Sequence, residues 1–320
     1  MASAAHDVAP GDAGTTLGDA WIRFWFTPAD VRPLAVVRIL AAALGLLLLW
    51  SYVGDLEAWF GPAGMVPADV AAGWRPRFGV SLFDGATTSA SLWALFGGTI
   101  AAFVALLVGL GSRLAAVAAA VLWASLLHRG PMLTGPADDV ISVLLWCLVV
   151  GPSSRAWSID RWLADRMGRR VAESSPWARV SLGLLQVHAS ALALAAALAQ
   201  LKGDVWWDGT AAWWLAARPS SLVDATAAYR SSEYLMNAVT HAIVVFEIAF
   251  AVGLWVGPLR RPIARAALVA WPLIGVVAGE PLWGLAMAIF AVPASLAGEE
   301  PAKRRLVEHG HAELLGRREL

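Results

Sequence analysis

This chain of 320 residues is poor in charge and nearly free of cysteine. Charged residues make up 15% of the sequence, against about 25% in soluble domains. The formal net charge is zero, which excludes the basic surface by which proteins bind nucleic acids. The single cysteine, Cys147, excludes a disulfide within this chain and a cysteine-based metal cluster, and we predict no metal site. Lysine is also scarce, since only Lys202 and Lys303 are lysines among the 24 basic residues.

Hydrophobic residues are abundant instead. They make up 58% of the chain, above the roughly 45–50% of soluble domains, and the mean hydropathy is +0.62. Several apolar runs approach the roughly 20 residues that a helix needs to cross the bilayer core. The 18 tryptophans fit a belt of aromatic side chains at the membrane interface. We therefore predict an all-α, multi-pass helical bundle in the lipid bilayer of the cell membrane.

Eight apolar segments are candidate membrane spans, at residues 34–53, 91–110, 113–127, 139–151, 178–199, 235–256, 263–278 and 281–297. The third, fourth, seventh and eighth are short for a span. Pro272 and Pro293 interrupt the last two, which predicts that these two are tilted, kinked or re-entrant. A six-span arrangement without the last pair is the alternative, and it leaves both ends of the chain on the same side.

Basic residues in the connecting segments predict the orientation. Most of the 24 basic residues fall on one set of segments, and the other set carries only Arg75, Arg77, Arg129, Lys202, Arg218 and Arg230. The positive-inside rule then places both termini in the cytoplasm and loops 54–90, 128–138 and 200–234 outside. Loop 152–177 faces the cytoplasm, where its segment 157–170 is predicted to lie on anionic lipid as an amphipathic helix.

The chain divides into three parts. Residues 1–20 lack the basic start and apolar run of a signal peptide, and we predict a disordered tail there. Residues 21–297 form the transmembrane domain, whose aromatic segment 21–26 is expected at the interface. Residues 298–320 are predicted to form a charged cytoplasmic tail.

Small and polar side chains follow one face of the fifth candidate span. At helical spacing this face collects Gln186, Ser190, Ala193, Ala197 and Gln200. Lipid cannot satisfy the hydrogen bonds of polar side chains, so this face is expected to point at protein or at a cavity. The span ends at Gln200 and is followed by Lys202, and we predict that an active site, if the chain has one, lies near this exit.

The residues beyond the exit have two interpretations. Trp206 and Trp207 are either interface anchors or a stacking platform for a quinone ring. Asp208 and Gly209 most simply form a turn, and the alternative places Asp208 in a polar pocket. Both interpretations put these residues at the membrane surface.

Glu247, His188, His241 and Arg38 are the ionisable residues inside the predicted spans that we single out. Glu247 is either a proton carrier or a structural group paired with a buried partner, because a charge at the centre of a membrane helix costs about 2.5–3.5 kcal/mol. His188 and His241 lack metal-ligand spacing and are either packing histidines or, for His188, a catalytic partner of Glu247. Arg38 is expected to extend its side chain to the cytoplasm, or else to turn inward.

A short outer loop is bracketed by His128 and Arg129 before it and by Asp138 and Asp139 after it. In the simpler interpretation Asp139 caps the helix that follows, because a carboxylate stabilises the free N–H groups of a helix start. In the functional interpretation this loop lines one polar pocket together with Lys202, Asp204 and Asp208.

Five motifs occur in order over residues 21–297. They are Thr27-Pro28-Ala29-Asp30 with Arg32 and Arg38; Asp55-Leu56 with Gly61-Pro62-Ala63-Gly64; Gly111-Ser112-Arg113 with His128-Arg129-Gly130-Pro131; Gly151-Pro152 with Trp157-Ser158-Ile159-Asp160; and Leu201-Lys202-Gly203 with Trp206-Trp207-Asp208-Gly209. Together they resemble the horizontally transferred transmembrane (HTTM) domain family, which includes the membrane part of vitamin K-dependent gamma-carboxylase. The resemblance implies the helical fold and a lipophilic cofactor of the quinone or quinol type.

The chain departs from that family at its catalytic position. The lysine of the carboxylase falls on Gln200, and a neutral amide cannot act as the base that a desolvated lysine becomes. Lys202 is offset by two residues, about 200° around the helix. Trp271 stands where the family commonly has a histidine, and the carboxylase's lumenal domain has no counterpart here. The resemblance therefore implies the fold rather than carboxylation.

Three functions are compatible with these features. The first is a membrane-embedded enzyme that uses a quinol-type cofactor near Gln200 and Asp208. The second is a non-catalytic membrane partner in the maturation or export of a secreted peptide such as a toxin. The third is a proton-coupled transporter, suggested by Glu247 and the proline-interrupted last spans, although the sequence lacks the inverted repeats of such transporters.

Overall fold

A computed structural model describes residues 16–77 and 79–296. Over these residues the chain forms fifteen α-helices, two short 3-10 helices and two strands of two residues each. The helices are α1 (Leu17–Phe26), α2 (Arg32–Tyr52), α3 (Leu56–Phe60), α4 (Ala68–Trp74), α5 (Ser89–Val108), α6 (Ser112–Arg129), α7 (Pro136–Val150), α8 (Ile159–Arg166), α9 (Pro176–Gln200), α10 (Asp204–Trp207), α11 (Ala211–Ala216), α12 (Thr226–Ser231), α13 (Glu233–Gly253), α14 (Gly257–Ala278) and α15 (Pro281–Leu296). The predicted helical class is confirmed.

Each of the eight predicted apolar segments is a helix, and five of them, namely α2, α5, α9, α13 and α14, are long and apolar enough to cross a membrane. The shortest are α7, with 15 residues, and α15, with 16 residues. At 1.5 Å per residue these two measure about 22 and 24 Å, less than a bilayer core of about 30 Å. Pro272 and Pro293 lie inside continuous helices, so neither of the last two segments is broken at its proline.

The N-terminal segment is more ordered than predicted. Residues 17–20, assigned to a disordered tail, form the first turn of α1. The Thr16 hydroxyl accepts a hydrogen bond from the Asp19 amide (3.2 Å), and the Asp19 carboxylate accepts one from the Thr16 amide (3.0 Å). This reciprocal capping box satisfies two N–H groups that a helix start leaves free. The rest of that tail, residues 1–15, and the predicted C-terminal tail, 298–320, lie outside the described residues.

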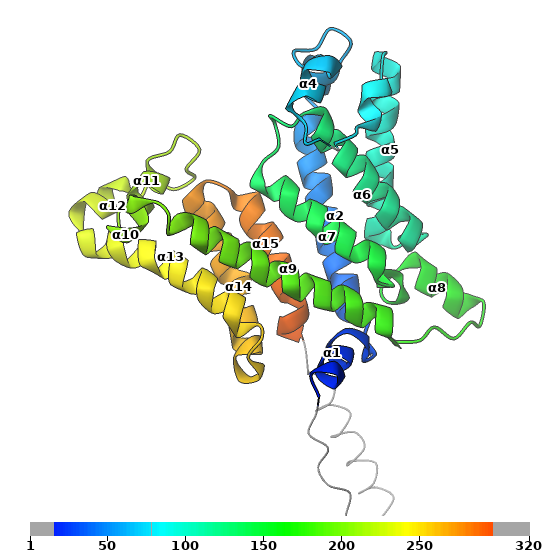
Figure 1. Cartoon of the computed structure of the whole chain (residues 1–320). Helices are drawn as coiled ribbons and strands as arrows, with labels where there is room; N and C mark the ends of the chain where they lie inside the picture. Colours follow the sequence, from blue (N-terminus) through cyan, green and yellow to red (C-terminus); the bar gives the residue numbers. More distant parts are fainter. Residues whose placement is uncertain (1–15, 78, 297–320) are drawn as a thin grey trace, which may run out of the picture.

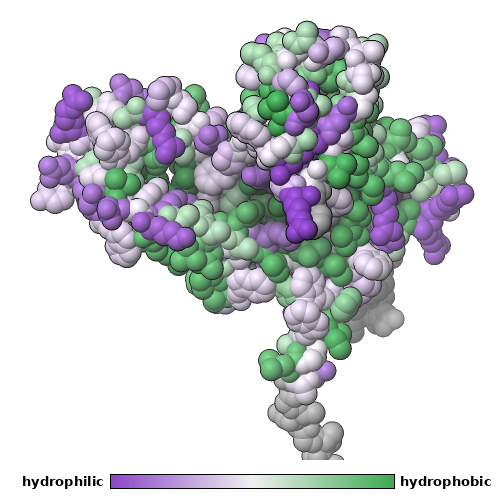
Figure 2. Space-filling view, turned by 45° about the horizontal axis from the view of Figure 1, so that its top comes forward, coloured by the Kyte–Doolittle hydropathy of each residue, from purple (hydrophilic) through white to green (hydrophobic). Residues whose placement is uncertain are grey.

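The long helices alternate in direction between two ends of the bundle (Figure 1). One end carries α4 and the short helices α10, α11 and α12, and we call it the upper end. The lower end carries α1 and α8 (Figure 1). Hydrophilic residues gather over the short helices at the upper end and over α8 at the lower end, whereas hydrophobic residues cover much of the surface between them (Figure 2).

The connector between α7 and α9 is bound to the lower end of the bundle. The buried Arg38 guanidinium donates to the carbonyls of Ser153 (2.7 Å) and Trp157 (2.6 Å). Arg38 is fully buried, so its side chain ends inside the protein, against this connector, and not in solvent. Gly109 must be glycine here, because its φ is +71° and a Cβ would lie 2.7 Å from an Arg38 nitrogen.

Further contacts connect this lower-end connector to the rest of the chain. The Asp160 carboxylate accepts hydrogen bonds from the backbone amides of Gly111 (2.9 Å) and Ser112 (3.1 Å), which caps the start of α6. Strand β1 (Ala29–Asp30) pairs antiparallel with β2 (Ser174–Ser175). These contacts involve three of the five sequence motifs and join segments that are far apart along the chain.

Candidate functional site

The polar face of α9 meets α13 at a pair of polar side chains. Gln200, the last residue of α9, donates its side-chain amide to a Glu247 carboxylate oxygen at 3.1 Å. Glu247 is fully buried, and along the same face of α9 the buried alanines Ala193 and Ala197 are small enough for close helix packing. Among the described residues, the second Glu247 carboxylate oxygen and the side-chain carbonyl oxygen of Gln200 have no hydrogen-bond partner. The structure therefore pairs two of the four predicted catalytic residues.

The other two candidates are not part of this pair. Lys202 is exposed, and the His188 ring bonds the Leu184 carbonyl of its own helix (2.8 Å). Gln186 is buried but lies 14 residues before Gln200 on α9, about 21 Å along the helix axis, and donates to the Leu254 carbonyl (3.0 Å). The polar face of α9 therefore contacts separate partners at its two ends.

Beyond the exit, Asp208 and Gly209 form a turn, as the simpler interpretation predicted. One Asp208 oxygen accepts hydrogen bonds from the amide (3.0 Å) and the hydroxyl (2.6 Å) of Thr210, and Gly209 adopts a φ of +79°. The buried Thr240 hydroxyl donates to the Gly209 carbonyl (2.9 Å) and accepts from the Ala212 amide (3.0 Å). The turn is thereby attached to α13.

The aromatic residues near this exit have structural contacts. Trp206 is half-buried, and the exposed Trp207 donates to the Leu201 carbonyl at 2.7 Å. Trp271, at the position where the family commonly has a histidine, is fully buried and contacts Phe250 and Trp283 edge to face. That position belongs to the aromatic core of α13, α14 and α15.

The contact between Gln200 and Glu247 predicts a measurable coupling. Replacing Gln200 by leucine leaves the buried carboxyl group without its donor, which is expected to lower the free energy of unfolding by about 1–3 kcal/mol. The double variant Gln200→Leu/Glu247→Leu is expected to regain most of that loss, since neither polar group is then left unpaired. Thermal unfolding of the four proteins in detergent measures the coupling. Strictly additive effects would show that the two side chains act independently.

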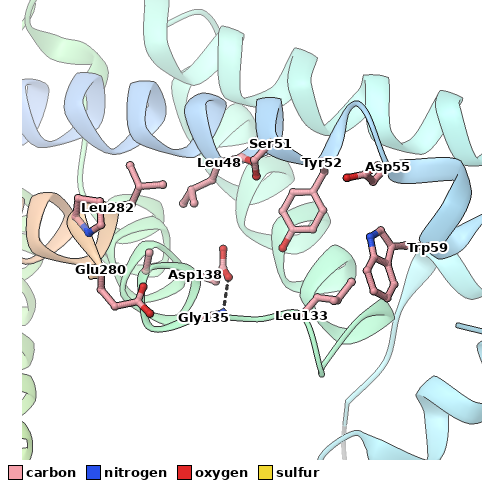
Figure 3. Close-up of a pocket in the computed structure, with 12 residues that line it drawn as sticks. Leu48, Ser51, Tyr52, Asp55, Trp59, Leu133, Gly135, Asp138, Glu280 and Leu282 are labelled. Atoms are coloured by element: carbon pink, nitrogen blue, oxygen red, sulfur yellow. Dashed lines mark hydrogen bonds between the residues drawn. The ribbon is translucent and has the colours of Figure 1, made fainter. Parts of the chain in front are cut away.

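A second site lies at the upper end, between α2, α7 and the start of α15. It is a cavity of about 390 Å³ with apolar walls. Its polar and aromatic side chains are Ser51, Tyr52, Asp55, Trp59, Asp138 and Glu280 (Figure 3). We call it the acidic cavity, because it is lined by three carboxyl groups and by no lysine, arginine or histidine.

Asp138 is the most constrained side chain of the acidic cavity. It is 5% exposed, and one carboxylate oxygen accepts a hydrogen bond from the Gly135 amide at 2.7 Å (Figure 3). This bond caps α7, so the prediction that Asp139 caps the helix is wrong: Asp138 is the third residue of α7, from which its side chain reaches back to the N-cap amide, whereas Asp139 is exposed. The other Asp138 carboxylate oxygen is buried and has no hydrogen-bond partner within residues 16–77 and 79–296.

His128 and Arg129 do not line the polar pocket that the functional interpretation predicted. Arg129 is buried, donates to the Val66 carbonyl (2.7 Å) and lies over the Phe60 ring. The His128 ring bonds the Val80 carbonyl (2.9 Å). Both residues thus attach the 54–90 loop to the end of α6, and the acidic cavity is lined by neither of them, nor by Lys202, Asp204 or Asp208.

Sequence reasoning identified Asp138 but missed the residues around it. Tyr52 is the last residue of α2, Asp55 follows that helix, and Glu280 lies in the short turn between α14 and α15. These residues share only their location in the chain, because each lies at or next to the upper end of a long helix. The spacing of residues in the sequence does not show which of these helix ends lie next to each other, because that depends on how the helices pack.

Comparisons of the chain with protein-family models, with curated proteins and with solved structures found no match. The resemblance to the HTTM family therefore stays a prediction.

Proposed function

We propose that the chain is an HTTM-like membrane protein that crosses the cell membrane eight times, with both termini in the cytoplasm. In this proposal its functional site is the acidic cavity, which opens at the outer face and binds a ligand carrying a positively charged ammonium group. The observation that carries the proposal is the buried Asp138 oxygen without a partner, in a cavity whose lining includes no basic residue.

Burial makes that oxygen costly unless it is paired. A polar group buried without a hydrogen bond costs about 1–3 kcal/mol in proteins, and a charged group more. A cation about 4 Å from a carboxylate gains about 4 kcal/mol at an effective dielectric constant of 20. The aromatic rings of Tyr52 and Trp59 line the same cavity, and cation–π contacts add about 0.5–2 kcal/mol.

An organic cation suits this site better than a metal ion. Among the described residues, no group of three histidine, cysteine, aspartate or glutamate side chains has the spacing to hold a metal. The carboxyl groups are instead combined with aromatic rings and leucines, the usual surroundings of a bound ammonium group. The volume of about 390 Å³ lies in the range of small-molecule sites.

The proposed topology is supported by the arrangement of helices and arginines. The eight long helices alternate in direction, and the arginine-rich connector that holds α8 lies at the lower end together with α1 (Figure 1). The positive-inside rule assigns that end to the cytoplasm. On α8, Trp162 is exposed beside Arg166, which is typical of a helix lying on a lipid surface.

Choline and its neutral isostere 3,3-dimethyl-1-butanol test the proposed site, because they differ in charge and hardly in shape. We expect isothermal titration of the purified protein in detergent to show binding of choline and at least tenfold weaker binding of the alcohol. The variant Asp138→Asn is expected to weaken choline binding at least tenfold, since the amide loses the negative charge that faces the ligand.

Asp139→Asn is the matched control, because Asp139 is the neighbouring residue, is exposed and does not line the cavity. We expect it to bind choline as the unmodified protein does. Equal affinity for choline and the alcohol, or an unchanged affinity in Asp138→Asn, would falsify the proposed site.

The quinol-dependent enzyme, the partner in peptide maturation and the proton-coupled transporter stay predictions. At the position of the carboxylase lysine, Gln200 contributes a neutral amide to its contact with Glu247, and the nearest lysine, Lys202, is exposed. The observations on the acidic cavity favour ligand binding there over proton abstraction at Gln200.

A further inference from the structure

An apolar groove lies beside the acidic cavity, on the flank of the bundle. It has a volume of about 330 Å³, and α2, α14 and α15 line it with aliphatic side chains and one proline, including Leu44, Leu47, Pro272 and Leu285. Leu47 and Leu285 are half exposed, so the groove is open along its side. None of the described residues that line it has a polar or charged side chain.

The groove and the acidic cavity share two walls. On α2 the groove ends at Leu47 and the cavity begins at the next residue, Leu48. On α15 the cavity ends at Leu282 and the groove begins at Leu285, which is one helical turn away. The groove therefore continues the cavity along the same pair of helices, from the polar upper end toward the middle of the bundle.

The dimensions of the groove favour an extended chain. Its residues on α2 run from Leu40 to Leu47, and those on α15 run from Leu285 to Val292. Each run covers about 10 Å along the helix axis. A slot of this length, apolar throughout and ending at carboxyl groups, matches a molecule with an aliphatic tail and a cationic head.

We infer that the ligand of the acidic cavity is an amphiphile, with its ammonium head at Asp138 and a single aliphatic chain in the apolar groove. This inference rests on the proposed function, because it requires the cation site in the cavity. The ligand class is a long-chain amine or quaternary ammonium lipid, which approaches sideways from the outer leaflet. The exposed side of the groove supplies the entrance.

A variant that fills the groove tests the binding of the aliphatic tail independently of the binding of the ammonium head. Ala43 lines the groove and is exposed, so Ala43→Phe fills the groove from its lipid-facing edge without disturbing the core. The matched control is Ala101→Phe, an exposed alanine on α5 that does not line the groove. Leu285→Trp on the opposite wall is a second blocking variant, used if Ala43→Phe fails to elute as a single species in size-exclusion chromatography.

The test compares choline with dodecyltrimethylammonium, which carries the same head on a long chain. Protein is placed in phosphatidylglycerol nanodiscs, because choline lipids would compete, and the signal of empty nanodiscs is subtracted. We expect Ala43→Phe to weaken dodecyltrimethylammonium binding at least tenfold while choline binding stays within twofold. Asp138→Asn is expected to weaken both ligands, and Ala101→Phe neither.

Each other outcome identifies which idea fails. If Ala43→Phe and Leu285→Trp leave binding of the long-chain probe unchanged while Asp138→Asn weakens choline binding, the tail site is wrong and the proposed function stands. If Asp138→Asn affects neither probe, the proposed function fails and the inference fails with it. If the long-chain probe binds Asp138→Asn as tightly as the unmodified protein, its binding is partition into lipid, and the inference is overturned.

Discussion

Replacing Gly284 by alanine is expected to destabilise the protein by about 3 kcal/mol or more and to abolish the proposed ligand binding at the acidic cavity. A Cβ at Gly284 would lie 2.5 Å from the Trp271 carbonyl oxygen and 3.0 Å from the Gly275 Cα. Both are backbone atoms of α14, so no change of rotamer relieves the clash and the two helices must separate. Overpacking of this kind costs about 1–3 kcal/mol even where side chains can move.

Ligand binding should be lost as well, because α15 and the turn before it contribute Glu280 and Leu282 to the cavity. Thermal unfolding in detergent and choline titration measure the two effects. Gly98→Ala is the matched control: Gly98 is also helical, on α5, and a Cβ there would meet no atom within 4 Å. If Gly284→Ala is as stable as Gly98→Ala, the close contact between α14 and α15 does not hold the bundle together.

Replacing Arg38 by methionine is expected to lower the free energy of unfolding by about 3–5 kcal/mol. Arg38 is fully buried and donates to the carbonyls of Ser153 and Trp157. A hydrogen bond from a charged group is worth about 1.5–3 kcal/mol, and methionine leaves both carbonyls without this donor. Trp157 also has a φ of +48°, a conformation that costs a non-glycine residue about 1–3 kcal/mol unless its surroundings enforce it.

In Arg38→Met the 152–177 connector is therefore expected to unfold locally before the rest of the protein. Limited proteolysis should cleave Arg38→Met within this connector faster than the unmodified protein, at temperatures where both remain folded. Arg38→Lys should recover part of the stability, since one ammonium group cannot reproduce two diverging guanidinium bonds. Arg113→Met, at an exposed position on α6, is the control for loss of an arginine. Cleavage at equal rates in Arg38→Met and Arg113→Met would show that Arg38 does not hold the connector.

The helices were largely predictable, because each depends on composition over a short stretch. The eight predicted apolar segments match α2, α5, α6, α7, α9, α13, α14 and α15 with ends shifted by a few residues. Predictions failed where the local sequence was compatible with two structures. Proline was expected to tilt, kink or break α14 and α15, and both helices continue past it, since neighbouring helices make an interior proline tolerable in a membrane bundle. Asp139 was expected to cap α7, although the carboxylate that accepts from the N-cap amide of Gly135 belongs to Asp138.

The sequence by itself determined the helical class, the helix positions, the polar face of α9 and the Asp208–Gly209 turn, because each depends on residues a few positions apart. Only the tertiary structure decided that Gln200 contacts Glu247, 47 residues away, and that Arg38 binds a connector 115 residues away. It also brought Asp138 and Glu280 into one cavity. The physical reason is that helix periodicity specifies which side chains share a face, whereas the choice of facing helix depends on backbone approach at small residues such as Gly284.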